Sequence, residues 1–168
     1  MAIFHLSFNM LKRSEGKSSC YLSAYNARTR IEDDRTGNVY DYSHRSDLFH
    51  HAILAPLNTP PNLIENSAVL WNEIEQLEKR KDAQLSRYFD IAIPAELDND
   101  AKIALVKNYC KRNFVSQGMV ADISFHNLNS HNPHAHVMLT LREITPDGFG
   151  KKNRSWNEHS LMDEWRSS

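Results

Sequence analysis

Residues 126–138, HNLNSHNPHAHVM, contain four histidines within thirteen positions. Side chains alternate between the two faces of a β-strand, so His134 and His136 share one face and the apolar residues between and after them share the other. His126 ends the preceding strand-like run, on the face opposite its apolar residues. If the two strands pair antiparallel through the intervening loop, the sequence predicts His126, His134 and His136 close together on one face outside the core.

Three neighbouring neutral imidazoles form a metal site. Without a metal, they would only depress one another's protonation. This donor set suits zinc, manganese, cobalt or nickel, whereas magnesium prefers oxygen ligands. Three protein ligands leave a coordination position open, which favours catalysis or substrate binding over a structural site. The residues alone indicate a hydrolase or phosphoryl-transfer site. The alternative is that these histidines lie on the strands without a shared function. His131, in the loop, is interpreted as not belonging to the site.

Two tyrosines form a second candidate group in SSCYLSAYNARTR, residues 18–30. Tyr21 and Tyr25 lie one helical turn apart, and Arg28 lies one turn beyond Tyr25. A tyrosine can attack phosphorus covalently, but its free pKa is about 10, so it needs a base, a cation or a polarised substrate. From the residues alone, the simpler interpretation is that both tyrosines are core residues with a polar tip.

The elements that position these groups follow from hydrophobic periodicity and from turn and cap residues. We expect strands over 2–9, 49–57, 87–94, 119–126 and 134–144, helices over 18–31, 62–80 and from Asp98 or Asn99 to about Ser116, a hairpin turn at 36–38, and a final helix beginning near 160. This order predicts an α+β fold with a largely antiparallel central sheet.

Length and composition fit one globular domain of 168 residues, with 40% hydrophobic and 24% charged residues. No apolar run approaches the roughly 18 residues of a membrane span, and the first residues do not resemble a signal peptide. The two cysteines, Cys20 and Cys110, suggest reduced thiols in a cytoplasmic protein.

The net charge of −1 argues against a protein coated in nucleic acid. Basic residues nevertheless gather in two segments, one within residues 11–30 and one at Lys151, Lys152 and Arg154. These segments are either solvated surface or the cations of a local nucleic-acid groove.

Four stretches carry a resemblance to a known family: MAIFHLSFNMLKRSEGKSS, YLSAYNARTR, LWNEIEQLEKRKDAQLSRYFDIAIPAEL and FHNLNSHNPHAHVMLTLREI. Together, and in this order, they resemble the MobA/MobL relaxases, which are conjugative nicking enzymes of the HUH endonuclease superfamily. NPHAHVM is the most distinctive of these motifs. The resemblance implies an antiparallel sheet flanked by helices, with the histidines on central strands. It also implies that residues 1–168 are a single nicking domain, the N-terminal part of a longer protein.

Carried over by motif, Tyr25 matches the family's catalytic tyrosine, and His126, His134 and His136 match its metal ligands. The resemblance implies one divalent ion, manganese or magnesium, with zinc, nickel and cobalt as alternatives. The segment RYFDIAIP departs from the family pattern, in which this strand is commonly rich in glutamate. Here Asp90 is the one carboxylate on the histidine face. Asp90 is expected to accept the phenolic proton of Tyr25, to orient a histidine, or simply to solvate the sheet.

The implied reaction is strand-specific nicking and religation of single-stranded DNA at a plasmid transfer origin. Tyr25 would attack a phosphodiester to give a 5′-phosphotyrosyl intermediate and a free 3′-hydroxyl. Auxiliary relaxosome proteins and a type IV secretion coupling protein are the implied partners. The residues expected to bind DNA are the cations Arg28, Arg30, Lys12, Arg13, Lys151, Lys152 and Arg154, and the aromatic side chains Tyr40, Tyr42, Phe149 and Trp156.

Three alternatives remain open from the sequence. A replication-initiation nuclease of the same superfamily would share the chemistry, but it usually carries its tyrosine after the histidines, whereas Tyr25 precedes them. A metal-dependent nuclease that uses water would leave Tyr25 structural. A non-catalytic, metal-stapled DNA-binding module is the third alternative, and the open three-ligand site argues against it.

Overall fold

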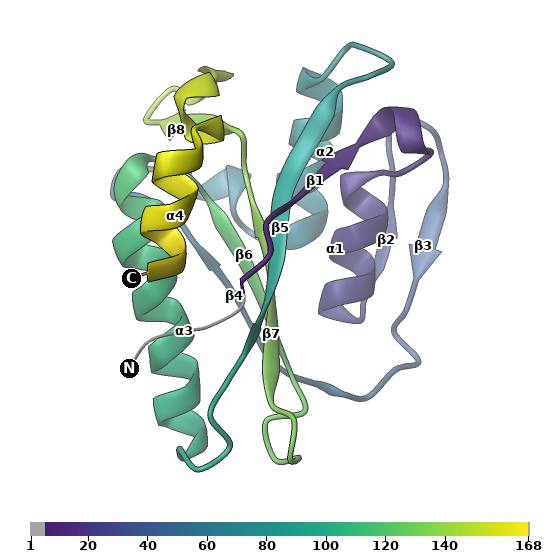
Figure 1. The fold of residues 1–168 in the computed structure, drawn as a ribbon. Coiled ribbons are helices and arrows are strands. Elements are labelled where there is room, and N and C mark those ends of the chain that lie inside the picture. The colour runs from purple at the N-terminus through teal and green to yellow at the C-terminus, as the bar shows by residue number, and fades with distance from the viewer. Residues whose placement is uncertain (1–5, 168) are drawn as a thin grey trace.

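The computed structural model describes residues 6–167. The elements are, in chain order, β1 (Asn9–Lys12), α1 (Ser19–Ala27), β2 (Arg30–Glu32), β3 (Val39–Asp41), β4 (Leu48–Leu54), α2 (Ser67–Leu77), β5 (Gln84–Ala92), α3 (Asn99–Asn113), β6 (Ala121–His126), β7 (His134–Leu139), β8 (Arg142–Thr145), β9 (Gly148–Lys152) and α4 (His159–Ser167) (Figure 1). No helix within these residues has the length and apolar character needed to cross a membrane.

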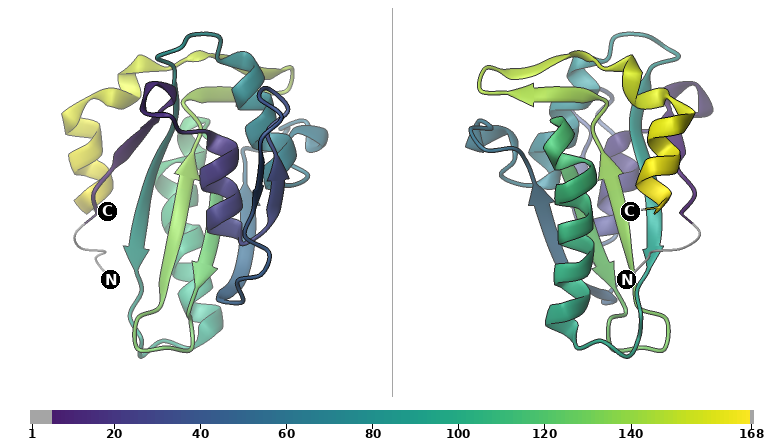
Figure 2. Two further views of the ribbon diagram at one scale, coloured as in Figure 1. Left: turned by 90° about the vertical axis from the view of Figure 1, so that its right-hand side faces the viewer. Right: turned by 60° about the vertical axis from the view of Figure 1, so that its left-hand side comes forward.

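A five-stranded sheet in the order β1-β5-β7-β6-β4 forms the centre of the molecule. Every neighbouring pair in it is antiparallel. Helices α3 and α4 lie on one face and α1 and α2 on the other, as the two side views show (Figure 2). The α+β fold with an antiparallel central sheet is therefore confirmed.

The face toward α3 and α4 carries the main core. Alternate residues of the central strands, such as Phe89, Ile123 and Val137, point to this face and are fully buried. They pack against Tyr109 and Phe114, which belong to α3 and the residue after it. The predicted alternation of β5, β6 and β7 is confirmed, and burial of this apolar surface supplies the main driving force for the sheet to form.

The opposite face is also largely covered, which corrects the expectation that it lies outside the core. Met138 on this face packs in a second core with Cys20 and Ala24 of α1 and with Leu70 and Trp71 of α2. The sequence pattern does not predict this layer, because the strand residues that share the face with Met138 are histidine, serine and aspartate. Such polar residues suggest a solvent-exposed face.

Helix α1 begins as predicted, because the side chain of Ser18 accepts a hydrogen bond from the backbone N–H of Cys20. It ends earlier than predicted, at Ala27. Arg28 adopts a left-handed conformation with φ of 51°. A non-glycine residue in this region is uncommon, and the bidentate ion pair between Arg28 and Asp47 holds it there. The chain can then turn back into β2.

Other boundaries also shift. Strand β1 covers Asn9–Lys12, whereas residues 6–8 of the predicted first strand have no regular structure and residues 2–5 lie outside the described part. The predicted strand over 134–144 is interrupted at Thr140, whose hydroxyl accepts the N–H of Val120 and donates to the carbonyl of Arg142. Beyond this point β8 pairs with β9 as a separate hairpin.

A buried carboxylate joins α2 to the sheet. Asp122 on β6 is 3% exposed and accepts hydrogen bonds from Nε1 of Trp71 at 2.8 Å and from Oγ of Ser67 at 2.6 Å. Nε2 of His51 on β4 lies 2.6 Å from its other oxygen. Three partners for one buried charge satisfy it well, so this network fixes the position of α2.

We predict that Asp122→Asn lowers the free energy of unfolding by about 2 kcal/mol, because an amide cannot accept from all three donors and one buried group loses its partner. Urea denaturation followed by circular dichroism measures the change. Asp147→Asn, at an exposed position, is the matched control and should be neutral. Equal stability of the two variants would contradict the structural role of Asp122.

Stability should also depend on pH through His51. Burial acts to lower its pKa, but the Asp122 carboxylate outweighs this and raises the pKa above the ordinary 6.5. The pair therefore stabilises the fold below pH 6.5, and this contribution disappears as the pH rises through the folded-state pKa. We predict that His51→Gln costs more stability at about pH 5.5 than at about pH 9. An equal cost at both pH values would show that the His51 charge plays no part.

Candidate metal centre

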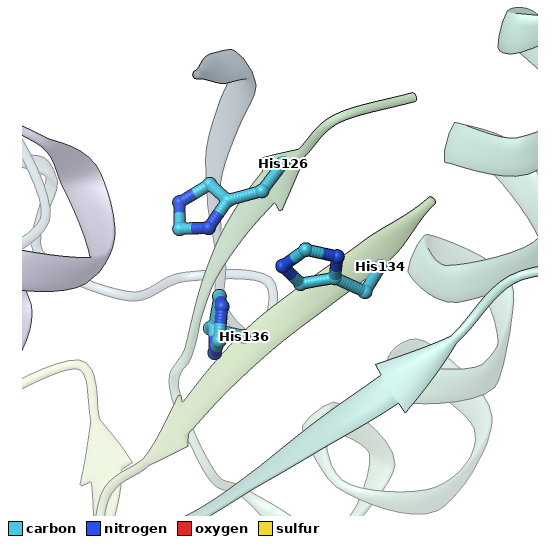
Figure 3. Close-up of side chains that lie close together, drawn as sticks. All are labelled: His126, His134 and His136. Carbon is cyan, nitrogen blue, oxygen red and sulfur yellow. The ribbon is translucent and has the colours of Figure 1, made fainter. Parts of the chain in front are cut away.

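Strand register brings the three predicted histidines together. His126 on β6 lies directly opposite His134 on β7, and His136 lies opposite Ser124, two residues along the same face. The ring centroids are 4.5 to 5.5 Å apart. One ligand nitrogen of each ring lies within 4.8 Å of the others, and the rings converge on a common space (Figure 3).

Each imidazole has one nitrogen engaged by a protein acceptor. Nε2 of His126 lies 2.6 Å from the backbone carbonyl of Asn26, and Nδ1 of His134 lies 2.9 Å from that of Asn132. Nδ1 of His136 lies 2.5 Å from a carboxylate oxygen of Asp90. Carbonyl and carboxylate oxygens only accept, so these ring nitrogens carry the hydrogen. The lone pairs that remain are on Nδ1 of His126 and on Nε2 of the other two rings.

His126 shows that the residues fit a metal ion. The side chain is fully buried, and its Nδ1 has no hydrogen-bond partner among the described residues. Burial lowers the pKa of His126 to about 4, so the ring is neutral near pH 7 and Nδ1 is a bare acceptor. A buried acceptor without a partner lowers the stability of the fold. A divalent cation would satisfy it, with two further imidazoles as ligands, and would keep a coordination position open.

Asp90 contacts His136 through a hydrogen bond. It lies on β5 directly opposite His136 and is exposed at the edge of the site. Desolvation acts to raise the pKa of Asp90, but the hydrogen bond from His136 and the nearby histidines lower it overall, so the carboxylate is ionised. Helix α1 approaches the triad from the His126 side. Of the three roles expected for Asp90, the geometry favours orienting a histidine.

Tyr25 lies near the C-terminal end of α1. The next residue, Asn26, supplies the carbonyl that holds His126. The Tyr25 ring is partly exposed and makes an edge contact with Tyr42 at 5.2 Å. The interpretation of Tyr25 as a core residue is therefore wrong. Hydrogen bonds from Arg45 and Arg28 lower its pKa, against the opposing effect of burial.

The predicted DNA-binding cations are dispersed. Arg28 is paired with Asp47, and Arg13 donates to the Glu75 carboxylate and to three backbone carbonyls. Lys152 forms an ion pair with Glu78. These internal contacts argue against a DNA role for Arg13 and Arg28. The cations that remain exposed are Lys12, Arg30, Lys151 and Arg154.

Two of the basic groups lie far from the histidines. Lys12 pairs with Gln84 at the start of β5, whereas His134 pairs with Ala92 at its end, about 26 Å away for a strand of this length. A cleft of about 370 Å³ near Gln84 is lined by Lys152 and Arg154, among others. Trp156, predicted to stack on bases, is instead 2% exposed and belongs to the main core.

Several groups at the site have no recognisable signal in the sequence. The carbonyls of Asn26 and Asn132 are backbone groups and leave no signal in residue type. Arg45 is an isolated arginine in the loop between β3 and β4, outside the basic segments.

Comparison with known proteins identifies related chains. The model of the MobA/MobL family matches residues 17–167. The conjugal transfer protein TraA of Agrobacterium fabrum is 37% identical over 90% of this chain and 14% of its own length. The mobilization protein MobL of Acidithiobacillus ferridurans is 32% identical over 90% of this chain and 46% of its own. The chain therefore spans less than half the length of either relative.

A solved structure has the same fold. It is described as "Molecular Basis of Vancomycin Resistance Transfer in Staphylococcus aureus" and superposes with a TM-score of 0.90. The two chains are 30% identical, and the match covers 98% of this chain and 87% of the other.

We predict that the purified protein binds one Zn²⁺ and that His136→Ala abolishes this binding in calorimetry. Asp90→Asn should weaken it about 10- to 100-fold, because the amide no longer fixes the tautomer of His136. His131→Ala, in the exposed loop, is the control and should bind normally. Undiminished binding by His136→Ala, or an equal loss in His131→Ala, would place the ion elsewhere.

Proposed function

Because the chain belongs to the MobA/MobL family, we propose that it nicks and rejoins one strand of DNA at a transfer origin, with Tyr25 as the nucleophile. The names of its relatives, which are conjugal transfer and mobilization proteins, support the DNA-processing role. The observation that carries the assignment of Tyr25 is the hydrogen bond between His126 and the carbonyl of Asn26. This bond holds Asn26, the residue after Tyr25, against His126.

In the proposed step, the phenolic oxygen of Tyr25 attacks phosphorus while the bond to the 3′-oxygen breaks. The products are a 5′-phosphotyrosyl bond and a free 3′-hydroxyl. One phosphodiester replaces another, so the bond energy is kept and the reverse reaction can reseal the strand. Attack by water would lose this energy. Partial exposure of Tyr25 and its lowered pKa support its role as the attacking group.

The histidine triad is the proposed site for one divalent ion. Bound there, the ion would polarise the scissile phosphate and offset its developing negative charge. Nδ1 of His126 and Nε2 of His134 and His136 are the proposed ligands. Asp90 is a positioning residue that holds the tautomer of His136.

The DNA strand is proposed to follow exposed cations and flat aromatic rings. Arg30, Tyr40 and Tyr42 lie on or next to the β2–β3 hairpin beside Tyr25, where stacking would guide the strand into the site. Lys12 and the segment 151–154 lie farther away and would contact DNA beyond the nicked nucleotide. Auxiliary relaxosome proteins and a secretion coupling protein are part of the proposal as partners.

We predict that Tyr25→Phe abolishes a covalent protein–DNA adduct, because phenylalanine lacks the attacking oxygen. The assay incubates the protein and Mn²⁺ with single-stranded oligonucleotides from the transfer origin of its own element and detects the adduct by denaturing electrophoresis. Tyr21→Phe is the matched control, one turn earlier on the same helix, and should form the adduct.

Other outcomes of this assay identify the alternatives. Cleavage that persists in Tyr25→Phe without an adduct indicates a nuclease that uses water. Loss of the adduct in Tyr21→Phe alone moves the nucleophile to Tyr21. Binding with no cleavage in the wild type indicates a non-catalytic module. Adduct formation at a replication origin, but not at the transfer origin, favours a replication-initiation enzyme.

A further inference from the structure

The Tyr25 ring lies close to two guanidinium groups from different parts of the chain. Cζ of Arg28, at the end of α1, is 4.6 Å from the ring centroid. Cζ of Arg45, in the loop between β3 and β4, is 5.4 Å from it. A cation at this distance is attracted to the ring, but the two arginines differ in what else they contact.

Arg28 is held in place by an acid and a backbone carbonyl. Its Nε and Nη2 donate to the two carboxylate oxygens of Asp47 at 2.7 and 2.9 Å, and its Nη1 donates to the backbone carbonyl of Tyr25 at 2.6 Å. The side chain is 6% exposed. Arg28 is therefore a fixed support at the end of the tyrosine helix, and it lowers the pKa of Tyr25 by less than Arg45 does.

Arg45 is held by its backbone but not by an acid. Its N–H donates to the carbonyl of Tyr42, and Asp47, two residues on, is anchored by Arg28 and accepts the N–H of Asn127 at 3.2 Å. The loop thus connects the tyrosine helix with the end of β6. Arg45 itself is exposed, and across residues 6–167 no carboxylate lies within ion-pair distance of its guanidinium.

We infer that Arg45 is a catalytic residue, whose guanidinium donates to the phenolic oxygen of Tyr25 and stabilises the negative charge on that oxygen during nicking and religation. This inference rests on the proposed function of Tyr25. It assigns a second role near the nucleophile that the histidine triad does not fill, because the triad is proposed to act on the phosphate through its metal ion.

A positive charge beside the phenolic oxygen is useful in both nicking and religation, because negative charge develops on that oxygen in each. In nicking, the phenol loses its proton to solvent, the bond from oxygen to phosphorus forms, the bond to the 3′-oxygen breaks, and that oxygen takes a proton from solvent. In religation, the phenolate is the leaving group. An arginine keeps its proton throughout, so Arg45 acts as a fixed donor at a site of developing charge.

The electrostatics around Tyr25 agree with this role. The groups that face its ring are Arg28, Arg45, Tyr21 and Tyr42, with Asp47 behind Arg28. Of the influences on Tyr25, the hydrogen bond from Arg45 is the largest, and it lowers the pKa despite the opposing effect of burial.

A fluorine titration tests the contact without DNA or metal. With 3-fluorotyrosine at position 25, the ¹⁹F chemical shift reports ionisation of this phenol alone. Arg45→Gln should move the titration to higher pH, Arg45→Lys should move it less, and Arg112→Gln, on α3 at the opposite face, should leave it unchanged. An unchanged titration in Arg45→Gln would overturn the inference, whether or not Tyr25 forms an adduct with DNA.

Kinetics test the catalytic consequence. Arg45→Gln should lower the single-turnover rate of adduct formation about 100-fold, as is typical when one donor to a developing charge is removed. The affinity for the same oligonucleotide should change little, and Arg45→Lys should recover part of the rate. If Arg45→Gln weakens DNA binding with the rate at saturation unchanged, Arg45 is a phosphate contact and the inference fails.

Discussion

The hydrogen bond from Nε2 of His126 to the carbonyl of Asn26 is the contact on which the rest of the site depends. It fixes the tautomer of a buried imidazole, so that the unpaired Nδ1 faces the other two histidines. It also fixes α1 against the sheet at the residue that follows Tyr25. One interaction therefore joins two groups that are about a hundred residues apart in sequence, and the geometry of both changes if it is lost.

The same face of the sheet carries two buried polar clusters with opposite properties. Around Asp122, three donors meet one carboxylate and no group is left without a partner. Around His126, one nitrogen of each ring faces a protein acceptor, and Nδ1 of His126 has no hydrogen-bond partner among the described residues. A satisfied cluster adds rigidity, whereas a cluster of convergent, unpaired acceptors needs a ligand of positive charge. This contrast separates the structural cluster from the candidate site.

Much of the fold and the histidine triad could be predicted because strand alternation is a local property. The spacing of His134 and His136, with apolar residues between and after them, is enough to assign the two histidines to one face of a strand. The end of the helix over 18–31 was predicted four residues too late, because it depends on the pairing of Arg28 with a distant Asp47. Trp156 was misjudged for the same reason, since its surroundings come from segments remote in sequence. The roles of Tyr25 and Asp90 and the identity of the ion stay predictions.

The most direct measurement of the central claim is a crystal structure of the protein with Zn²⁺, with the ion located by its anomalous scattering. The prediction is one ion bonded at about 2.1 Å to Nδ1 of His126 and to Nε2 of His134 and His136. An ion bound elsewhere, or one held by Nε2 of His126 after its bond to Asn26 has broken, would contradict it.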